Sequence, residues 1–220
     1  MYQNSYRPPT AFAVFPPVIK NLLIINGLVY MAQLLYNSFL IPLFALWPVG
    51  TPYVNVNFWP WQLVSYGFLH GSFMHVLFNM FGLWMFGVQI ENTWGSKRFA
   101  IYYFACVIGA GLVQLVVATL AAQSGEVYPT VGASGGVFGI LLAFGMLFPN
   151  QVIMLLFPPI PMKAKYMVIL FGGFALFAGV GGIGSNIAHF AHLGGMIFGF
   201  LLIMYWRGKL PIKPKRRMHY

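Results

Sequence analysis

The serine at position 134 has the clearest chemical potential of any side chain in this sequence. It lies in the stretch Gly132-Ala133-Ser134-Gly135-Gly136, which matches the Gly-x-Ser-x-Gly pattern of hydrolases with a serine nucleophile. Glycine and serine are also frequent where membrane helices pack closely. The pattern alone therefore leaves two roles open for Ser134, one in catalysis and one in helix packing.

Side chains that could work with a serine nucleophile occur in two other segments of the chain. The first segment contains His70, His75 and Asn79, and the second contains His189 and His192. His75 and Asn79 are four residues apart, so they share one face of a helix. A neutral imidazole can take the proton of a serine hydroxyl, and an amide can donate to the oxyanion of acyl transfer. This set of residues favours acyl-transfer chemistry.

The acidic residues exclude several other chemistries. The chain contains no aspartate, and its only acids are Glu91 and Glu126. An aspartyl protease needs two aspartates, and a zinc protease needs His-Glu-x-x-His, whereas Val-Leu-Phe-Asn follows His75. Proton-coupled transport usually relies on carboxylates inside the spans. Without a carboxylate to orient the base, a serine mechanism must rely on a Ser–His dyad.

A b-type haem site is an alternative from a different class. His75 and His192 could supply axial ligands from facing helices. This interpretation leaves Ser134 and Asn79 without a role.

The composition indicates which elements must position these residues. Of the 220 residues, 60% are hydrophobic and 6% are charged, and a soluble domain of this length could not bury so much apolar surface. A helix needs about 20 mostly apolar residues to cross the bilayer core. We therefore expect an all-α membrane protein with six candidate spans at residues 18–40, 69–90, 98–122, 133–148, 166–180 and 187–206.

The positive charges predict an orientation for these spans. All 12 Lys and Arg residues lie on one side of these spans: near the start of span one, at the connections between spans two and three and between spans four and five, and after span six. The positive-inside rule then places both termini in the cytoplasm. We expect a multi-pass protein of the cell (inner) membrane. The basic tail at 207–217 is interpreted as a topology anchor that attracts anionic lipid, not as a nucleic-acid-binding segment.

The fourth span is short enough to place Ser134 inside the membrane. Residues 133–148 would rise only about 24 Å, less than the hydrocarbon thickness. Pro149 and the lysines that follow hold its inner end near the cytoplasm, so residues 128–132 should enter the membrane without helical structure. Such backbone is tolerated only where protein buries it or where it lines a water-filled cavity. We expect Ser134 at the floor of a cavity that opens to the outer side.

Four motifs in this order resemble those of the rhomboid family of intramembrane serine proteases. They are His-x-x-x-x-His-x-x-x-Asn at 70–79, ENTWGS at 91–96, GASGGVFG at 132–139 and AHLGGMIFG at 191–199. The resemblance covers residues 18–206 and implies a six-transmembrane-helix rhomboid-like bundle. It implies that Ser134 is the nucleophile and His192 the general base. His75 and Asn79, with backbone N–H groups near the serine, would form the oxyanion hole.

The resemblance also implies supporting roles for other residues. Glu91 would pair with Ser96, and Phe138 would stack on the catalytic imidazole. Gly195 and Gly199 would let the fourth and sixth spans approach closely, because small residues allow close backbone contact. The glycines around the serine then serve both packing and catalysis.

Three further residues are given structural interpretations or left open. His70 and His189 are interpreted as structural rather than catalytic. Gln62 stands where some rhomboid relatives carry Arg, which leaves the bonding of the first outer loop open.

The resulting hypothesis is an intramembrane serine endopeptidase without cofactor or metal. Its partners would be single-pass or multi-pass membrane protein substrates and the lipid bilayer, with no nucleic acid. Residues 1–17 and 207–220 would be cytoplasmic tails, and residues 18–206 the six-helix protease domain. The alternative within the family is an inactive relative that only binds membrane proteins.

Overall fold

Six apolar helices dominate the computed structural model, which describes residues 12–50, 56–154, 159–181, 188–212 and 214. Five of them are long and apolar enough to cross a membrane, so the protein is an integral membrane protein with several helical spans. Residues 1–11, 213 and 215–220 of the two predicted tails lie outside the described residues. The helices are α1 (Pro17–Phe44), α3 (Phe73–Trp94), α4 (Ser96–Gln123), α5 (Ser134–Leu147), α6 (Ala164–Gly181) and α7 (His189–Trp206).

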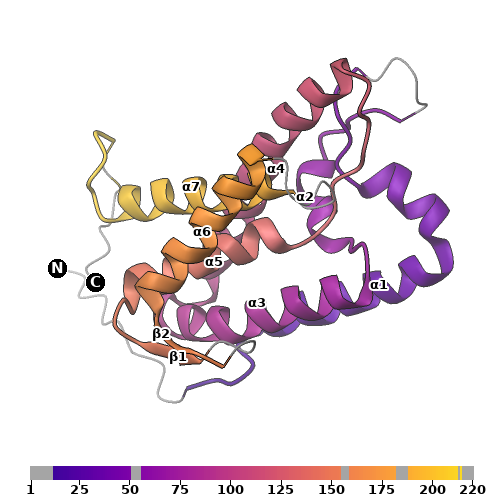
Figure 1. Ribbon diagram of the computed structural model, residues 1–220. Helices are drawn as coiled ribbons and strands as arrows, with labels where there is room; N and C mark the ends of the chain where they lie inside the picture. The colour runs from indigo at the N-terminus through magenta and orange to yellow at the C-terminus, as the bar shows by residue number, and fades with distance from the viewer. Residues whose placement is uncertain (1–11, 51–55, 155–158, 182–187, 213, 215–220) are drawn as a thin grey trace.

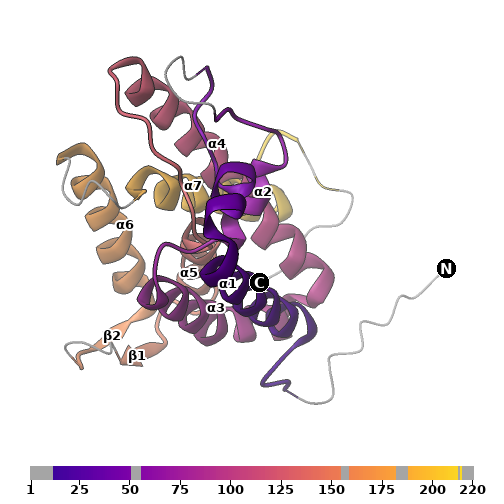
Figure 2. The ribbon, with the colours of Figure 1, turned by 90° about the vertical axis from the view of Figure 1, so that its right-hand side faces the viewer.

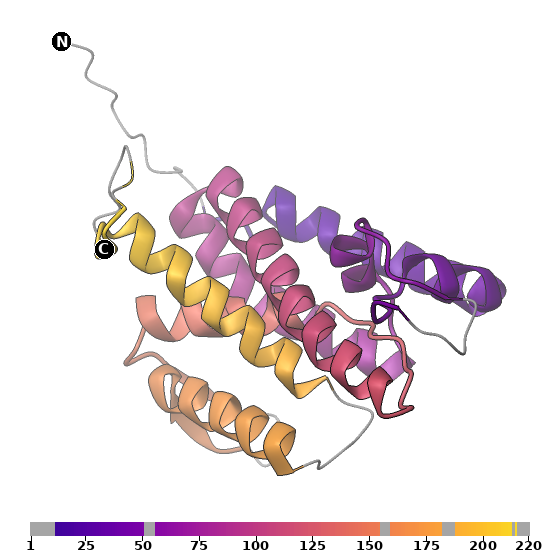
Figure 3. The same ribbon diagram turned by 90° about the horizontal axis from the view of Figure 1, so that it is seen from above.

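The helix α5 is the shortest of the six and lies at the centre of the bundle. It has 14 residues, which gives a length of about 21 Å at helical rise. It packs against α3, α4, α6 and α7 (Figure 3). Its glycines and apolar residues are buried on several sides, as expected for a helix that other helices surround. The prediction of a short fourth helix that begins near Ser134 is confirmed.

The start of α3 differs from the predicted second span. The sequence predicted a span from residue 69, but the helix begins at Phe73 because Ser72 caps it. The Ser72 hydroxyl oxygen accepts a hydrogen bond from the backbone N–H of His75 at 3.1 Å, which satisfies one of the free donors of the first turn. His70 therefore precedes the helix instead of lying on it.

The connection between α1 and α3 contains a short helix, α2 (Gln62–Ser65), followed by a 3₁₀ turn, η1 (Tyr66–Phe68). Gln62 organises this connection from a fully buried position. Its side-chain oxygen accepts from the backbone N–H groups of Trp47 and Trp59, both at 3.2 Å. Its amide nitrogen donates to the carbonyl oxygen of Leu43 in the last turn of α1. A neutral amide thus supplies the loop bonding that the sequence left open.

Glu91 fixes the opposite end of the bundle. Its carboxylate is buried and accepts hydrogen bonds from the backbone N–H groups of Val18 and Ile19 at 3.0 and 2.9 Å. The Ser96 hydroxyl donates to the same carboxylate at 2.6 Å. A carboxylate at a helix N-terminus satisfies free donors and interacts favourably with the helix dipole. Glu91 therefore ties the start of α1 to the α3–α4 turn.

A two-stranded hairpin interrupts the all-α pattern between α5 and α6. Strands β1 (Val152–Met154) and β2 (Pro161–Lys163) are antiparallel, with Val152 opposite Lys163. Figure 2 shows the hairpin next to the N-terminal end of α6. The sequence analysis missed these strands, although β-branched Val152 and Ile153 favour extended structure. The fold is mostly helical rather than purely so.

Candidate active site

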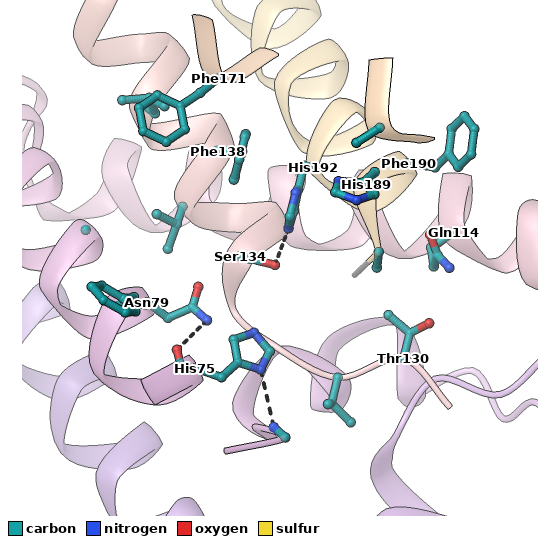
Figure 4. Close-up of a pocket in the computed structure, with 18 of the residues that line it drawn as sticks. His75, Asn79, Gln114, Thr130, Ser134, Phe138, Phe171, His189, Phe190 and His192 are labelled. Atoms are coloured by element: carbon teal, nitrogen blue, oxygen red, sulfur yellow. Dashed lines mark hydrogen bonds between the residues drawn. The ribbon is translucent and has the colours of Figure 1, made fainter. Parts of the chain in front are cut away.

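The structure brings Ser134 and His192 into direct contact. Ser134 is the first residue of α5, and His192 lies in the first turn of α7. The Nε2 atom of His192 is 2.9 Å from the Ser134 Oγ atom (Figure 4). This is hydrogen-bond distance, and it is the distance at which an imidazole can take the hydroxyl proton.

Glycine contacts explain why α5 and α7 approach closely enough for this hydrogen bond. A Cβ atom added to Gly195 would overlap the carbonyl oxygen of Gly135 and lie 2.8 Å from its carbonyl carbon. A Cβ atom on Gly139 would lie 3.2 Å from the Gly195 carbonyl oxygen. The backbones of the two helices are therefore in contact at this point, and only glycine fits at position 195.

Gly199 has a different neighbour from the one the sequence predicted. An added Cβ would overlap the hydroxyl of Tyr102 on α4 and lie 3.0 Å from Cys106 Sγ. The Tyr102 hydroxyl in turn donates to the carbonyl oxygen of Gly139 on α5 at 2.7 Å. The expectation that Gly199 brings α5 and α7 together is wrong, because the Tyr102 side chain from α4 occupies that space.

Phe138 holds the His192 imidazole in place. The two rings are stacked, with centroids 4.1 Å apart and planes 4° from parallel. Phe138 lies one helical turn after Ser134, so the residue that carries the hydroxyl and the residue that stacks on the imidazole share one face of α5. Phe171 of α6 contacts the Phe138 ring edge-on at 6.4 Å. Packing therefore fixes the plane of the imidazole.

His75 presents a hydrogen-bond donor to the site. Its Nδ1 atom accepts a hydrogen bond from the backbone N–H of Gly71 at 3.3 Å (Figure 4). In a neutral imidazole with an accepting Nδ1, the proton is on Nε2. A Cβ atom on Gly132 would lie 2.7 Å from Nε2 of His75 and 3.7 Å from Ser134 Oγ. The Nε2 atom of His75 and the Ser134 hydroxyl thus lie on either side of Gly132, and the oxyanion-hole role of His75 stays a prediction.

Gly132 allows His75 and Ser134 to come close together. Its φ angle is +126°, which side chains rarely adopt, and an added Cβ would collide with the His75 ring. Its N–H group donates to the Tyr66 carbonyl oxygen at 2.9 Å. This bond holds the segment before α5 against the 3₁₀ turn.

Asn79 is buried in α3 and borders the same cavity. One hydrogen of its Nδ2 group is donated to the carbonyl oxygen of His75 at 2.9 Å (Figure 4). An amide nitrogen carries two hydrogens, so the second remains for another acceptor. The oxyanion-hole role of Asn79 stays a prediction that depends on this second hydrogen.

Two further histidines flank the central pair. The side chain of Gln33 in α1 forms two hydrogen bonds with the backbone of His70. Its oxygen accepts from the His70 N–H at 2.8 Å, and its nitrogen donates to the His70 carbonyl oxygen. Its ring lies 5.1 Å from His75, and burial, with a smaller contribution from His75, lowers the pKa of His70 to about 4. His189 lies 6.1 Å from His192. The two histidines interpreted as structural thus each contact a ring of the site.

The site lies in one cavity of about 1410 Å³. Ser134, His192, His75 and Asn79 all border it, and α3, α5 and α6 contribute most of its apolar wall. Gln114 of α4 also borders it, buried to 2% exposure, and sequence analysis missed it. An uncharged polar side chain inside an apolar span was the available signal, because such groups are costly in a membrane.

The geometry does not favour the haem alternative. The Nε2 atom of His192, which would have to bind iron, is hydrogen-bonded to Ser134 instead. Within the described part of the chain, no group of three or more His, Cys, Asp or Glu side chains could hold a metal ion. Fold and site together define an integral membrane protein with a serine and a histidine paired in a cavity among its helices.

Comparison with known proteins identifies the family. A rhomboid domain matches residues 57–209, which is more than half of the chain. The chain is 31% identical over 157 residues to "Rhomboid protein 1, mitochondrial" of Saccharomyces cerevisiae, covering 71% of this chain and 45% of the relative. It is 33% identical over 144 residues to "Putative rhomboid protease YdcA" of Bacillus subtilis, covering 64% of this chain and 65% of the relative. The chain belongs to the rhomboid family.

A third relative is similar over almost the whole chain. "Rhomboid protease GlpG" of Yersinia pestis is 26% identical over 208 residues, covering 93% of this chain and 68% of the relative. The chain spans 45% and 65% of the lengths of the first two relatives.

Proposed function

We propose that this protein is a serine endopeptidase that cleaves transmembrane segments of other membrane proteins. The 2.9 Å contact between Ser134 Oγ and His192 Nε2 carries the proposal. Membership of the rhomboid family and its similarity to relatives named as rhomboid proteases support it.

In the proposed first step, Ser134 attacks the scissile carbonyl carbon of the substrate. His192 Nε2 accepts the hydroxyl proton while the Oγ–C bond forms, and the carbonyl oxygen becomes an oxyanion. The imidazolium then donates this proton to the leaving amine nitrogen as the C–N bond breaks. The result is an acyl-enzyme on Ser134 and a free amine product.

The oxyanion would be stabilised by donors that are already in place. The Nε2–H of His75, backbone N–H groups near Ser134 and the second Nδ2 hydrogen of Asn79 are the candidates. Fixed donors in a site of low dielectric constant stabilise developing charge strongly. In the second half of the cycle, His192 would take a proton from water as the water attacks the acyl carbon, and return it to Ser134 Oγ as the ester breaks.

We also propose the finer topology. Residues 18–206 form a six-span protease domain, in which the short α5 crosses the membrane inside the bundle, and residues 1–17 and 207–220 form cytoplasmic tails. The distribution of Lys and Arg residues supports this orientation in the cell (inner) membrane, with the active site open to the outer side.

Substrates must unwind locally before they can be cleaved. A helix hides its carbonyl carbons behind its own hydrogen bonds and side chains, so segments weakened by Gly, Pro or polar residues are the expected targets. Substrates would be single-pass or multi-pass proteins that enter from the lipid bilayer.

Covalent labelling tests the proposal directly. We expect a fluorophosphonate probe to label the purified wild-type protein, whereas Ser134→Ala should show no labelling and His192→Ala a strong loss. Both variants should also fail to cleave a single-span substrate while keeping the wild-type melting profile. Labelling of Ser134→Ala at the wild-type level would refute Ser134 as the nucleophile.

A further inference from the structure

The charged side chains in the described part of the chain lie almost entirely at the end of the bundle opposite the site. The site end is defined by the starts of α3, α5 and α7 and by the end of α4. Among the described residues, the Lys and Arg side chains lie where α1, α4 and α6 begin and just after α7 ends. Glu91 lies with them, because it binds the start of α1.

Glu126 is the exception. It is the one charged side chain of the described residues at the site end, and it is solvent-exposed. It also borders the cavity that contains Ser134 and His192, and no Lys or Arg borders that cavity. Among the described residues that border the cavity, Glu126 is therefore the single charged side chain, and its charge is negative.

The chain between α4 and α5 sets the position of Glu126 relative to Ser134. A turn after α4 places the Glu126 N–H 3.1 Å from the Ala121 carbonyl oxygen. The chain then runs to Ser134 without helix, and Thr130 forms two backbone hydrogen bonds with Leu46. Figure 1 shows this connection running from the projecting end of α4 back to α5. Glu126 thus lies at the far end of a fixed, irregular segment that leads to the nucleophile.

Tyr128 provides a second observation that Glu126 faces the site. Tyr128 borders the same cavity. Burial raises the pKa of its hydroxyl, a hydrogen bond with Gln114 lowers that pKa, and the negative charge of Glu126 raises it. The carboxylate is therefore close enough to act on groups inside the cavity mouth.

We infer that Glu126 makes the protein prefer substrates with a lysine or arginine in the segment that leaves the cavity at the site end. This inference rests on the proposed protease function. An extended substrate advances about 3.3–3.6 Å per residue, which is also the greatest advance per residue of the α4–α5 connection. Glu126 precedes Ser134 by eight residues. The preferred basic residue should therefore lie up to about eight residues from the scissile bond.

The expected discrimination is modest. Glu126 is exposed, so the attraction to a substrate cation resembles that of a surface ion pair. We expect a lysine substrate to exceed its glutamine counterpart by about two- to fivefold in kcat/KM at low ionic strength, and a glutamate substrate to fall below it. The difference should shrink in 0.5 M salt, because salt screens exposed charges.

The test uses one single-span substrate. At each of the eight positions beyond the scissile bond in its outer segment, three versions are made that carry Lys, Gln or Glu. Wild-type protein should cleave the three versions in the order Lys, Gln, Glu at the responsive position. Glu126→Gln should cleave all three at the rate of the Gln version, and Glu126→Lys should reverse the order. Equal Lys-to-Glu ratios in the wild type and in Glu126→Gln would overturn the inference.

A matched control moves the charge without changing the net charge. Gln123 is exposed, lies one turn before Glu126 and does not border the cavity. The double substitution Gln123→Glu with Glu126→Gln should behave like Glu126→Gln alone. Retention of the lysine preference in the double variant would overturn the assignment to Glu126. If the wild type cleaves none of the versions, the proposed function fails, and the inference fails with it.

Discussion

The contact between Gly195 and Gly135 makes a quantitative prediction. In Gly195→Ala, the new Cβ would lie 2.8 Å from the Gly135 carbonyl carbon, whereas carbon atoms in contact are about 3.5–4.0 Å apart. The start of α7 must therefore move away from α5 by roughly 1 Å. The atoms nearest to the new Cβ all belong to the Gly135 backbone, so no side chain can rotate to relieve the overlap.

This displacement acts directly on the proposed catalytic pair. His192 lies one turn before Gly195, so its Nε2 atom should move from 2.9 Å to beyond hydrogen-bond distance of Ser134 Oγ. A misplacement of 1 Å can cost about 10²-fold in rate. We expect kcat/KM on a fluorescent single-span substrate in proteoliposomes to fall by about that factor, and fluorophosphonate labelling to slow in parallel.

Gly173→Ala is the matched control. It makes the same substitution in α6, where an added Cβ meets no atom within 4 Å. Its activity should be that of the wild type. If Gly195→Ala keeps wild-type activity and labelling, the close approach of α5 and α7 does not position the dyad.

Three other substitutions test separate parts of the structure. Asn79→Ala should lower turnover by about 10² to 10³, the usual effect of losing one oxyanion donor, while probe labelling of the serine stays detectable; full turnover would remove Asn79 from the oxyanion hole. Glu91→Gln should lower the melting temperature more than the turnover per folded molecule, because the buried charge that binds the start of α1 is lost; a large loss of turnover with an unchanged melting temperature would contradict this. The pKa of His70 in the folded protein, about 4, lies below the ordinary value of 6.5, so its contribution to stability is complete above pH 6.5 and falls as the pH drops towards 4. His70→Asn should therefore reduce the drop in melting temperature between pH 7.5 and pH 5, and an undiminished drop would exclude His70 as its source.

The sequence predicted the elements of this fold well where long apolar runs define them. The six helices occur at the predicted places, and the predicted short fourth helix is α5. The predicted start of this helix, residue 69, was wrong by four residues, because the Ser72 cap and not hydrophobicity determines where α3 begins. The hairpin between α5 and α6 was missed because its strands are only three residues long, too short for a period-2 pattern to be seen.

The site was predictable in its residues but not in its contacts. The candidate histidines, asparagine and serine can be recognised from their positions in three apolar segments. Sequence spacing does not say which glycine faces which helix. Gly195 faces α5 as expected, whereas Gly199 faces Tyr102 on α4. Helix faces depend on rotation and crossing angle, which packing determines. The partners of Gln62 stayed open and Gln114 was missed for a similar reason, since the role of a buried amide is recognised only when its partners or its cavity are known.

The absence of a third catalytic residue gives this packing a chemical role in the proposed mechanism. In a triad, a carboxylate orients the histidine and stabilises the imidazolium. Here one acid, Glu91, is bound to the start of α1 at the opposite end of the bundle, and the other, Glu126, is exposed at the cavity mouth. The orientation of His192 must come from the stacked ring of Phe138, 4.1 Å away, and from the glycine contact that places α7 against α5. A base held by packing depends on the whole helix interface, so substitutions at that interface should reduce activity before they unfold the protein.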